Sequence, residues 1–138
     1  MNSFFGFLLL LLFQTTEVYN VNLTISNIKE EDGNLVIAVF DNEEDFMNKE
    51  KIIKYLPVTS ASETMVTQFS LPKGAYSIAV FHDTNGNKEL DKNYIGIPKE
   101  AFGFSNKSFG LFGPPDFDDT KFEVRQPNET VLVKLVHL

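Results

Sequence analysis

Short segments in which apolar and polar residues alternate recur along most of the chain, a pattern typical of strands with one buried face. The first is 21–26, where Val21, Leu23 and Ile25 alternate with polar residues. Further strands are predicted at 35–40, 65–71, 75–81, 121–124 and 130–136. Turn residues separate these segments, and strands do not alternate with long helices. The pattern therefore predicts an all-β fold, an antiparallel β-sandwich of about seven strands.

Two turn sequences suggest how these strands pair. Residues 31–34 (EDGN) predict a hairpin between 21–26 and 35–40, and residues 72–74 (PKG) predict a second one between 65–71 and 75–81. Segment 75–81 carries apolar residues at both parities. We expect Tyr76, Ile78 and Val80 on one face, Ser77, Ala79 and Phe81 on the other, and this strand to be the most enclosed.

Residues 41–55 break the alternation and predict one short surface helix. Asn42 can cap it, acidic residues follow in the first turn, and lysines gather toward the far end. Phe46 and Ile53, seven positions apart, would share a face. The helix is expected to lie on the outside of the sandwich.

A long stretch from Asp83 to Thr120 has no regular pattern but is rich in aromatic residues, with Phe102, Phe104 and Phe117 among them. Loops of this length are usually functional or disordered, and this one is too apolar to be disordered. One interpretation is a groove of aromatic platforms for a peptide or sugar. The favoured one is a long aromatic loop that covers an open end or face of the sandwich, since large apolar patches rarely stay exposed.

The N-terminus predicts export. Residues 4–13 (FFGFLLLLLF) form an uncharged apolar run that is too short to span a membrane and fits the central region of a signal peptide. We assign 1–20 to a signal peptide and 21–138 to a single β-sandwich domain, and place the protein in the periplasm or outside the cell. An uncleaved signal is the alternative, and is the expected route of any membrane association.

Composition narrows the possible partners. The 12 Lys and Arg against 19 Asp and Glu give a net charge of −7, which makes nucleic acids and anionic membranes poor partners. The chain has no cysteine, so disulfides and thiolate metal sites are excluded. The expected partner is an extracytoplasmic ligand or protein of unknown identity.

One segment has the composition of a metal-binding loop. Oxygen-bearing side chains stand at alternate positions, as in a calcium loop, where they can turn toward a common centre. These residues are Asp83, Asn85, Asn87, Glu89 and Asp91. The pattern is not an EF-hand, because Lys88 replaces the glycine and Tyr94 the bidentate acid. A further ligand could come from Asn93, Glu100, Asp116, Asp118 or Asp119. The alternative is a polar turn around Asn85–Gly86.

Histidine chemistry has little support in the sequence. His82 and His137 lack zinc-ligand spacing, and there is no nucleophile elbow for a hydrolase. We expect His82 to be a solvent-facing imidazole at the end of a strand.

The segments 71–83 (LPKGAYSIAVFHD), 84–91 (TNGNKELD), 95–106 (IGIPKEAFGFSN) and 113–117 (GPPDF) resemble a bacterial family catalogued as domain of unknown function 2141. The resemblance runs from about Val21 to the C-terminus. It implies a small exported protein with a transthyretin-like, prealbumin-type β-sandwich, which belongs with the Ig-like sandwiches, and it implies no activity. One departure is Lys88, where a glycine is commoner in the family. Transthyretin-like hydrolases of urate metabolism share the fold class, but their C-terminal Tyr-Arg-Gly-Ser motif is absent.

These observations predict an exported, non-enzymatic β-sandwich module of unknown ligand, whose Asp/Asn loop either binds Ca²⁺ or is only a structured turn. A calcium-dependent carbohydrate- or peptide-binding protein is the first alternative, and a hydrolase is the second.

Overall fold

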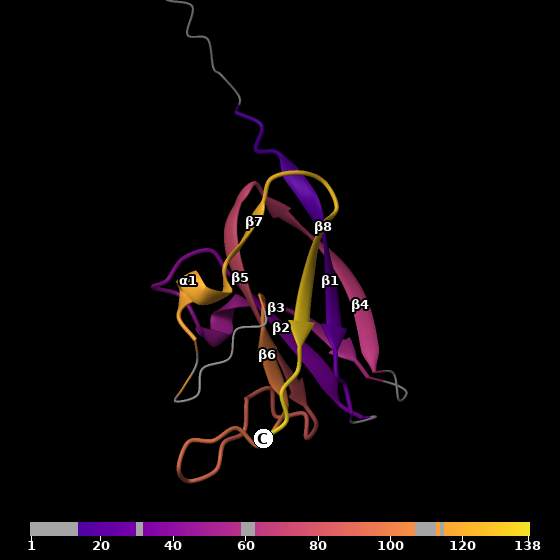
Figure 1. Cartoon of the computed structure of the whole chain (residues 1–138), viewed down its shortest axis with the longest axis vertical. Helices are drawn as coiled ribbons and strands as arrows, with labels where there is room; N and C mark the ends of the chain where they lie inside the picture. The colour runs from indigo at the N-terminus through magenta and orange to yellow at the C-terminus, as the bar shows by residue number, and fades with distance from the viewer. Residues whose placement is uncertain (1–13, 30–31, 59–62, 107–112, 114) are drawn as a thin grey trace, which may run out of the picture.

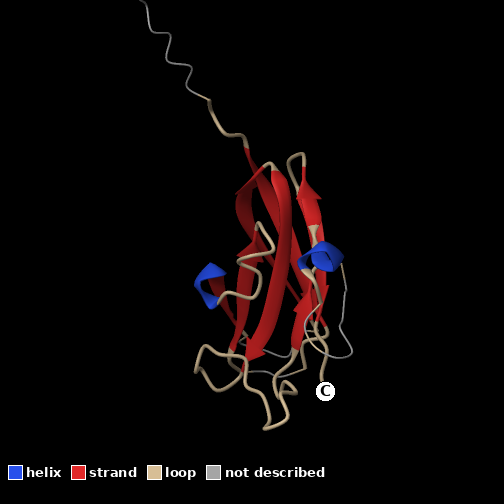
Figure 2. Cartoon of the chain, turned by 90° about the vertical axis from the view of Figure 1, so that its left-hand side faces the viewer, coloured by secondary structure: helices blue, strands red, loops and turns tan. Residues whose placement is uncertain are grey.

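The protein is a two-layer β-sandwich in the computed structural model, which describes residues 14–29, 32–58, 63–106, 113 and 115–138. One sheet has the strand order β4-β1-β8, and the other has the order β3-β2-β5-β6, with β7 also paired to β5. The strands are β1 (Val18–Ser26), β2 (Asn34–Phe40), β3 (Ile52–Pro57), β4 (Thr64–Pro72), β5 (Gly74–Asp83), β6 (Phe102–Phe104), β7 (Phe122–Val124) and β8 (Glu129–Lys134). The strands run along the long axis (Figures 1 and 2). The predicted all-β sandwich is confirmed.

The main core lies between the two sheets. Alternate residues of β1 point inward, and Val21, Leu23 and Ile25 have no exposed surface. They face Leu35, Ile37 and other residues of the larger sheet in a single apolar cluster. Period-two alternation therefore identifies the buried face of β1 correctly.

Both predicted hairpins are wrong. β1 pairs with β4 and β8, whereas β2 pairs with β3 and β5 in the other sheet. Likewise, the turn at 72–74 carries the chain from β4 in one sheet to β5 in the other. Alternation specifies which face of a strand is buried, but it does not distinguish a neighbour in the same sheet from a partner across the core.

The faces of β5 are as predicted. Tyr76, Ile78 and Val80 belong to the core between the sheets, and Ala79 packs on the opposite side of its own sheet. β5 lies between β2 and β6. The prediction that it would be the most enclosed strand is wrong, because six of the seven residues of β2 are buried, against six of ten in β5.

The predicted helix at 41–55 is also wrong. Turns occupy most of its first half, Met47 has a left-handed φ of 69°, and only Lys49–Lys51 form a short 3₁₀-helix, η1. Residues 52–57 become β3, an edge strand that pairs with β2. The β-branched pair Ile52–Ile53 suits this extended pairing, and the strand satisfies an edge of β2 that a surface helix would leave open.

Part of the long loop packs against the outer face of the larger sheet. Phe117, in the short helix α1 (Phe117–Thr120), joins Phe40 and Ala38 in a second apolar cluster, and Phe46 lies against it. The ring centroids of Phe46 and Phe117 are 6.0 Å apart. Phe104 is 4% exposed and Phe102 is half-buried. The prediction that Phe102, Phe104 and Phe117 pack onto the sandwich is confirmed, whereas Phe109, Leu111 and Phe112 lie outside the described residues.

Buried hydroxyl groups anchor α1 to the sheet. The Ser77 and Thr120 hydroxyls lie 2.6 Å apart, and the Ser105 hydroxyl donates to the Thr120 carbonyl oxygen at 2.5 Å. All three side chains are fully buried. The aromatic cover is thus attached by polar contacts as well as by its rings.

β1 begins at Val18, three residues before the predicted strand, with Val18, Tyr19 and Asn20 paired to β4. The apolar run 4–13, which is assigned to the central region of the predicted signal peptide, lies entirely outside the described residues. In the part of the chain that is described, no helix is long and apolar enough to cross a membrane.

Candidate functional site

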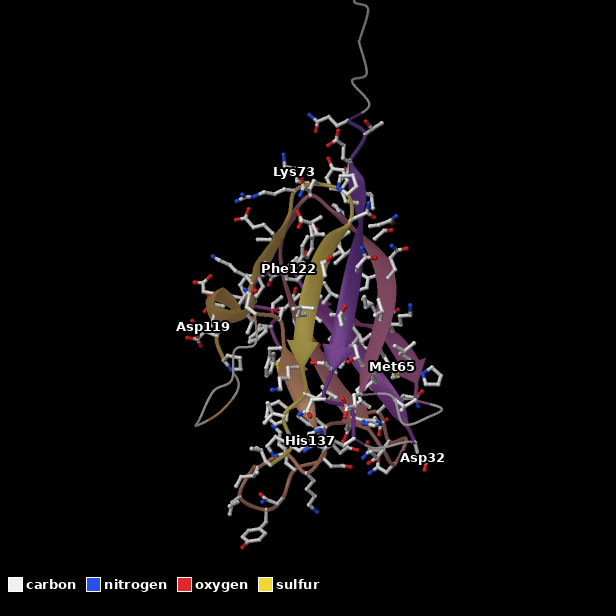
Figure 3. All side chains as sticks on the ribbon, turned by 45° about the vertical axis from the view of Figure 1, so that its right-hand side comes forward. Asp32, Met65, Lys73, Asp119, Phe122 and His137 are labelled. Atoms are coloured by element: carbon white, nitrogen blue, oxygen red, sulfur yellow. The ribbon has the colours of Figure 1, made fainter. Side chains whose placement is uncertain are left out.

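The predicted metal loop lies at one end of the sandwich, in the connection from β5 to β6. This connection hangs below the sheets, opposite the end from which the N-terminal segment leaves (Figure 1). Figure 3 places Asp32 and His137 toward the same end as this connection and Lys73 at the other. We call residues 83–91 the Asp/Asn loop and residues 93–97 the loop tip.

Asp83 organises the backbone of the Asp/Asn loop. It is the last residue of β5 and only 1% exposed. Its Oδ1 accepts the Gly86 N–H and its Oδ2 accepts the Lys88 N–H, both at 2.9 Å. Both carboxylate oxygens therefore already hold the turn closed.

The other predicted residues converge on Asp91. Its Oδ2 accepts from the Asn85 amide at 2.5 Å, and its Oδ1 accepts from the Asn87 amide at 2.8 Å. The amide oxygens of the two asparagines accept backbone N–H groups of Asn87 and Glu89, respectively. The structure thus brings Asn85, Asn87 and Asp91 together around one carboxylate.

Glu89 turns away from this group. Its carboxylate accepts a hydrogen bond from Lys49, with 2.9 Å between Nζ and Oε1, in a largely exposed ion pair. This hydrogen bond raises the pKa of the Lys49 ammonium group. The Glu89 side chain is therefore directed to η1 and not to the centre of the loop.

Lys88, which stands where the family more often has glycine, has a backbone conformation that suits glycine. Its φ of 64° lies in the left-handed region, which glycine adopts without cost and other L-residues adopt at about 1–2 kcal/mol. The Lys88 side chain extends to Tyr55, with Nζ 5.5 Å from the ring centroid. The loop keeps a backbone shape suited to glycine although a lysine occupies the position.

Glu100 also organises the loop. In the sequence it is only one of five possible additional ligands. It is 8% exposed; its Oε1 accepts from the N–H (3.0 Å) and hydroxyl (3.3 Å) of Thr84, and its Oε2 from the N–H of Asp91 (3.2 Å). Glu100 therefore ties the start of the Asp/Asn loop to its end. Its position just before the apolar segment 101–104 was the available signal of burial.

The other possible additional ligands do not join this group. Asn93 caps the loop tip, and the acidic residues 116, 118 and 119 belong to α1 or its N-cap. An open pocket beside the loop is lined by Thr84, Asn85, Asp91, Lys92, Lys99 and Glu100. Its charged groups are of both signs.

The chemistry open to this arrangement is binding by oxygen ligands. Across the described residues, no three Asp, Glu, His or Cys side chains are grouped as a metal site would require. The side-chain oxygens that the Asp/Asn loop could offer to a cation at Asp91 are those of Asp91 itself and of the Asn85 and Asn87 amides. Rotation of an amide about its last torsion exchanges NH₂ for oxygen, so Asn85 and Asn87 can present either group to the same point.

Both histidines are committed to backbone carbonyl groups. His82 has no exposed surface, and its Nε2 donates to the Asp32 carbonyl oxygen at 2.6 Å. The prediction of a solvent-facing His82 is wrong, because it follows Tyr76, Ile78 and Val80 at period two on the core face. Nε2 of His137 bonds the Asn27 carbonyl oxygen at 2.8 Å. In the described part of the chain, neither ring contacts a nucleophilic side chain.

The chain was compared with known proteins. No curated protein and no solved structure shows significant similarity to it. One family matches over residues 23–132, which covers β2 to β7, the last four residues of β1, part of β8 and the whole Asp/Asn loop. The chain therefore belongs to the family described as uncharacterized protein conserved in bacteria, DUF2141.

Proposed function

We propose that this protein is an exported, non-enzymatic binding module whose Asp/Asn loop binds Ca²⁺ weakly. The observation that carries the calcium proposal is the convergence of Asn85 and Asn87 on the two carboxylate oxygens of Asp91. Calcium accepts both carboxylate and amide oxygens in flexible geometry. If the two amides rotate, one carboxylate and two amide oxygens face a common point, and water completes the shell.

The same geometry supports low affinity. Rotation of the amides breaks their bonds to the backbone N–H groups of Asn87 and Glu89. Asp91 is the one carboxylate directed to this point, because Asp83 is occupied by backbone N–H groups. Few charges and lost hydrogen bonds place the expected Kd at about 10⁻⁴–10⁻³ M, the range of extracellular modules.

The surroundings of the hydroxyl and imidazole groups support a binding role over an enzymatic one. His82 is buried against a carbonyl oxygen, and the hydroxyls of Ser77, Ser105 and Thr120 are buried against one another or the backbone. A nucleophile and its base must reach substrate, and must lie within hydrogen-bond distance of each other. A hydrolase would therefore need a nucleophile and a base other than these hydroxyl and imidazole groups.

Thermal unfolding in Ca²⁺ and in EDTA tests the calcium proposal. At a calcium level tenfold above Kd, linkage predicts a stabilisation of about 1.4 kcal/mol, which raises Tm by several degrees. Mg²⁺ should not substitute, because it requires a smaller octahedral site. The same Tm in EDTA and in excess calcium would contradict the calcium proposal and leave the loop with a structural role as a turn.

Two single substitutions distinguish a proposed calcium ligand from a loop residue that points away from the site. Asp91→Asn should abolish the calcium-dependent rise in Tm, since it removes the carboxylate on which the amides converge. Glu89→Gln is the matched control, because that side chain points to Lys49, and it should retain the rise. Loss of the rise in both variants would refute this assignment of ligands.

Export is tested by the mass of the protein recovered outside the cytoplasm. Tyr19 packs against the core, and Val18 to Asn20 pair with β4. Cleavage that preserves β1 must therefore fall before Val18, so we expect a mature N-terminus between Gln14 and Val18. A mass that retains residues 1–13 in a membrane fraction would instead identify an uncleaved anchor.

A further inference from the structure

The loop tip displays apolar side chains that nothing in the described structure covers. Tyr94 is 99% exposed, Ile95 is 65% exposed and Ile97 is 42% exposed. They belong to the connection from β5 to β6, which lies at the end of the molecule opposite the N-terminal segment (Figure 1). Phe104 of β6 and Phe117 of α1, which follow the tip in the sequence, are buried. The tip is therefore exposed although later apolar residues of the chain pack into the fold.

The polar backbone of the tip is largely satisfied within the turn. Oδ1 of Asn93 accepts the N–H groups of Ile95 and Ile97, at 3.0 and 2.9 Å. The Asn93 N–H donates to the Ile97 carbonyl oxygen at 2.8 Å, and the Gly96 N–H to the Asn93 carbonyl oxygen at 3.0 Å. A turn with these internal bonds can leave water at a lower cost than one whose N–H groups depend on water.

The exposed charged side chains next to the tip are basic. Lys92 and Lys99 are exposed on either side of it, and neither forms an ion pair with a described residue. The neighbouring carboxylates of Asp91 and Glu100 keep their negative charge, but Asp91 is half-buried and Glu100 is only 8% exposed, so they present less charge to the surface than the two lysines do. The apolar tip is therefore flanked by two free ammonium groups.

We infer that the loop tip inserts into the interfacial region of a lipid bilayer that carries anionic headgroups. Tyrosine favours this region because its ring is apolar and its hydroxyl remains wet. Lys92 and Lys99 would lie at the level of the headgroups, where each basic residue favours binding. The net charge of −7 opposes adsorption of the whole molecule, so only this end would make contact, and the binding would be weak and reversible.

A bilayer suits the shape of the tip better than a protein partner does. The apolar residues occupy the convex end of a single turn, so a protein would need a cavity shaped to receive them. Fluid lipid adapts to a projecting turn without a preformed pocket. This inference does not require a metal in the Asp/Asn loop, so it can fail or succeed independently of the calcium proposal.

The absence of cysteine permits a local test on the exported protein. Ile95→Cys carries an environment-sensitive fluorophore at the tip, and Val66→Cys carries it on the outer face of β4, where the native residue is equally exposed at 66%. Both are mixed, in EDTA, with vesicles of phosphatidylcholine containing phosphatidylglycerol and with phosphatidylcholine alone. Any retained N-terminal segment is common to both proteins, so a difference between them reports on the tip.

We expect a blue shift and a gain in emission at position 95 but not at 66, with the anionic vesicles giving the larger response. Lys92→Gln and Lys99→Gln should each weaken binding about fivefold, the value expected for about 1 kcal/mol per lysine. No response at 95, or equal responses at the two positions, would overturn the inference. A concentration-dependent response at 95 without vesicles would overturn it in favour of contact with a second copy of the chain.

Discussion

The connection between β5 and β7 divides into two parts that both carry large apolar side chains but differ in whether these side chains are buried. Residues 84–100 project from the end of the sandwich and leave Tyr94 and Ile95 in solvent, whereas in the described residues of the second part Phe104 of β6 and Phe117 of α1 are buried. The difference lies in the backbone. The second part pairs with β5 through β6, while the first satisfies its N–H groups with the side chains of Asp83, Asn93 and Glu100.

The comparison predicts the largest effect for the aromatic residues of the packed part. Phe104→Ala should destabilise the protein by about 3–5 kcal/mol, because it removes a ring that is 4% exposed and leaves a cavity. Tyr94→Ala, from the projecting part, should change stability by less than about 0.5 kcal/mol. Urea unfolding of both variants measures the difference. Similar losses in the two would abolish the distinction between the parts.

The projecting part should depend on its buried carboxylates. Glu100→Ala leaves the N–H groups of Thr84 and Asp91 without their acceptor and should cost about 1–3 kcal/mol. Glu89→Ala removes an exposed ion pair with Lys49 and should cost no more than about 1 kcal/mol. Chemical denaturation gives both values. An equal cost for the two glutamates would mean that Glu100 does not organise the loop.

Lys88 offers a stabilising change within the same part. Lys88→Gly should increase stability by about 0.5–1 kcal/mol, because glycine adopts a φ of 64° without the steric cost that lysine bears. Lys88→Ala is the control: it also loses the contact with Tyr55 but retains the left-handed strain. The glycine variant should therefore be the more stable of the two in thermal unfolding. The opposite order would show that the side-chain contact outweighs the strain.

The smallest expected effect on stability is at Asp45, in the turn next to Phe46, whose ring packs against Phe117. Hydrogen bonds from Asn42 and Lys51 lower the pKa of the Asp45 carboxyl group. A lowered pKa contributes stability above the unfolded value of 3.8, and this contribution is lost as the pH falls through the folded value. The free energies of unfolding of the wild type and of Asp45→Asn, measured as a function of pH, should therefore converge once the pH is below the folded pKa of Asp45. A difference that persists in acid would point to a role other than charge.

Much of the fold could be predicted because burial on one face leaves a local trace in the sequence. Val21, Leu23 and Ile25, like Tyr76, Ile78 and Val80, occupy the core as their alternation indicates. Pairing could not be predicted in the same way, since the residues of 21–26 fit equally well beside β2 or opposite it. β3 was missed because the lysines and acids of 41–55 resemble the charge pattern of a helix, and a three-residue strand such as β6 is too short for its period to be read.

The candidate site was predictable in its position and only partly in its arrangement. The spacing of oxygen-bearing residues located the loop, and Asn85, Asn87 and Asp91 do meet. The orientation of Asp83 and Glu89 depends on partners distant in space, the backbone of the turn and Lys49. The burial of His82 follows from its parity with Val80, a signal that was present in the sequence.

The position of β1 has a consequence for how the chain acquires its structure. β1 is the central strand of its sheet, and one of its neighbours, β8, is the last strand of the chain, paired from Val21 with Glu129 to Ser26 with Lys134. The smaller sheet is therefore incomplete until β8 has been synthesised. Until then one edge of β1 is open, and contacts between such distant segments form slowly. Completion of the smaller sheet must therefore follow the synthesis of β8, whereas β2, β3 and β5 of the larger sheet can pair before it.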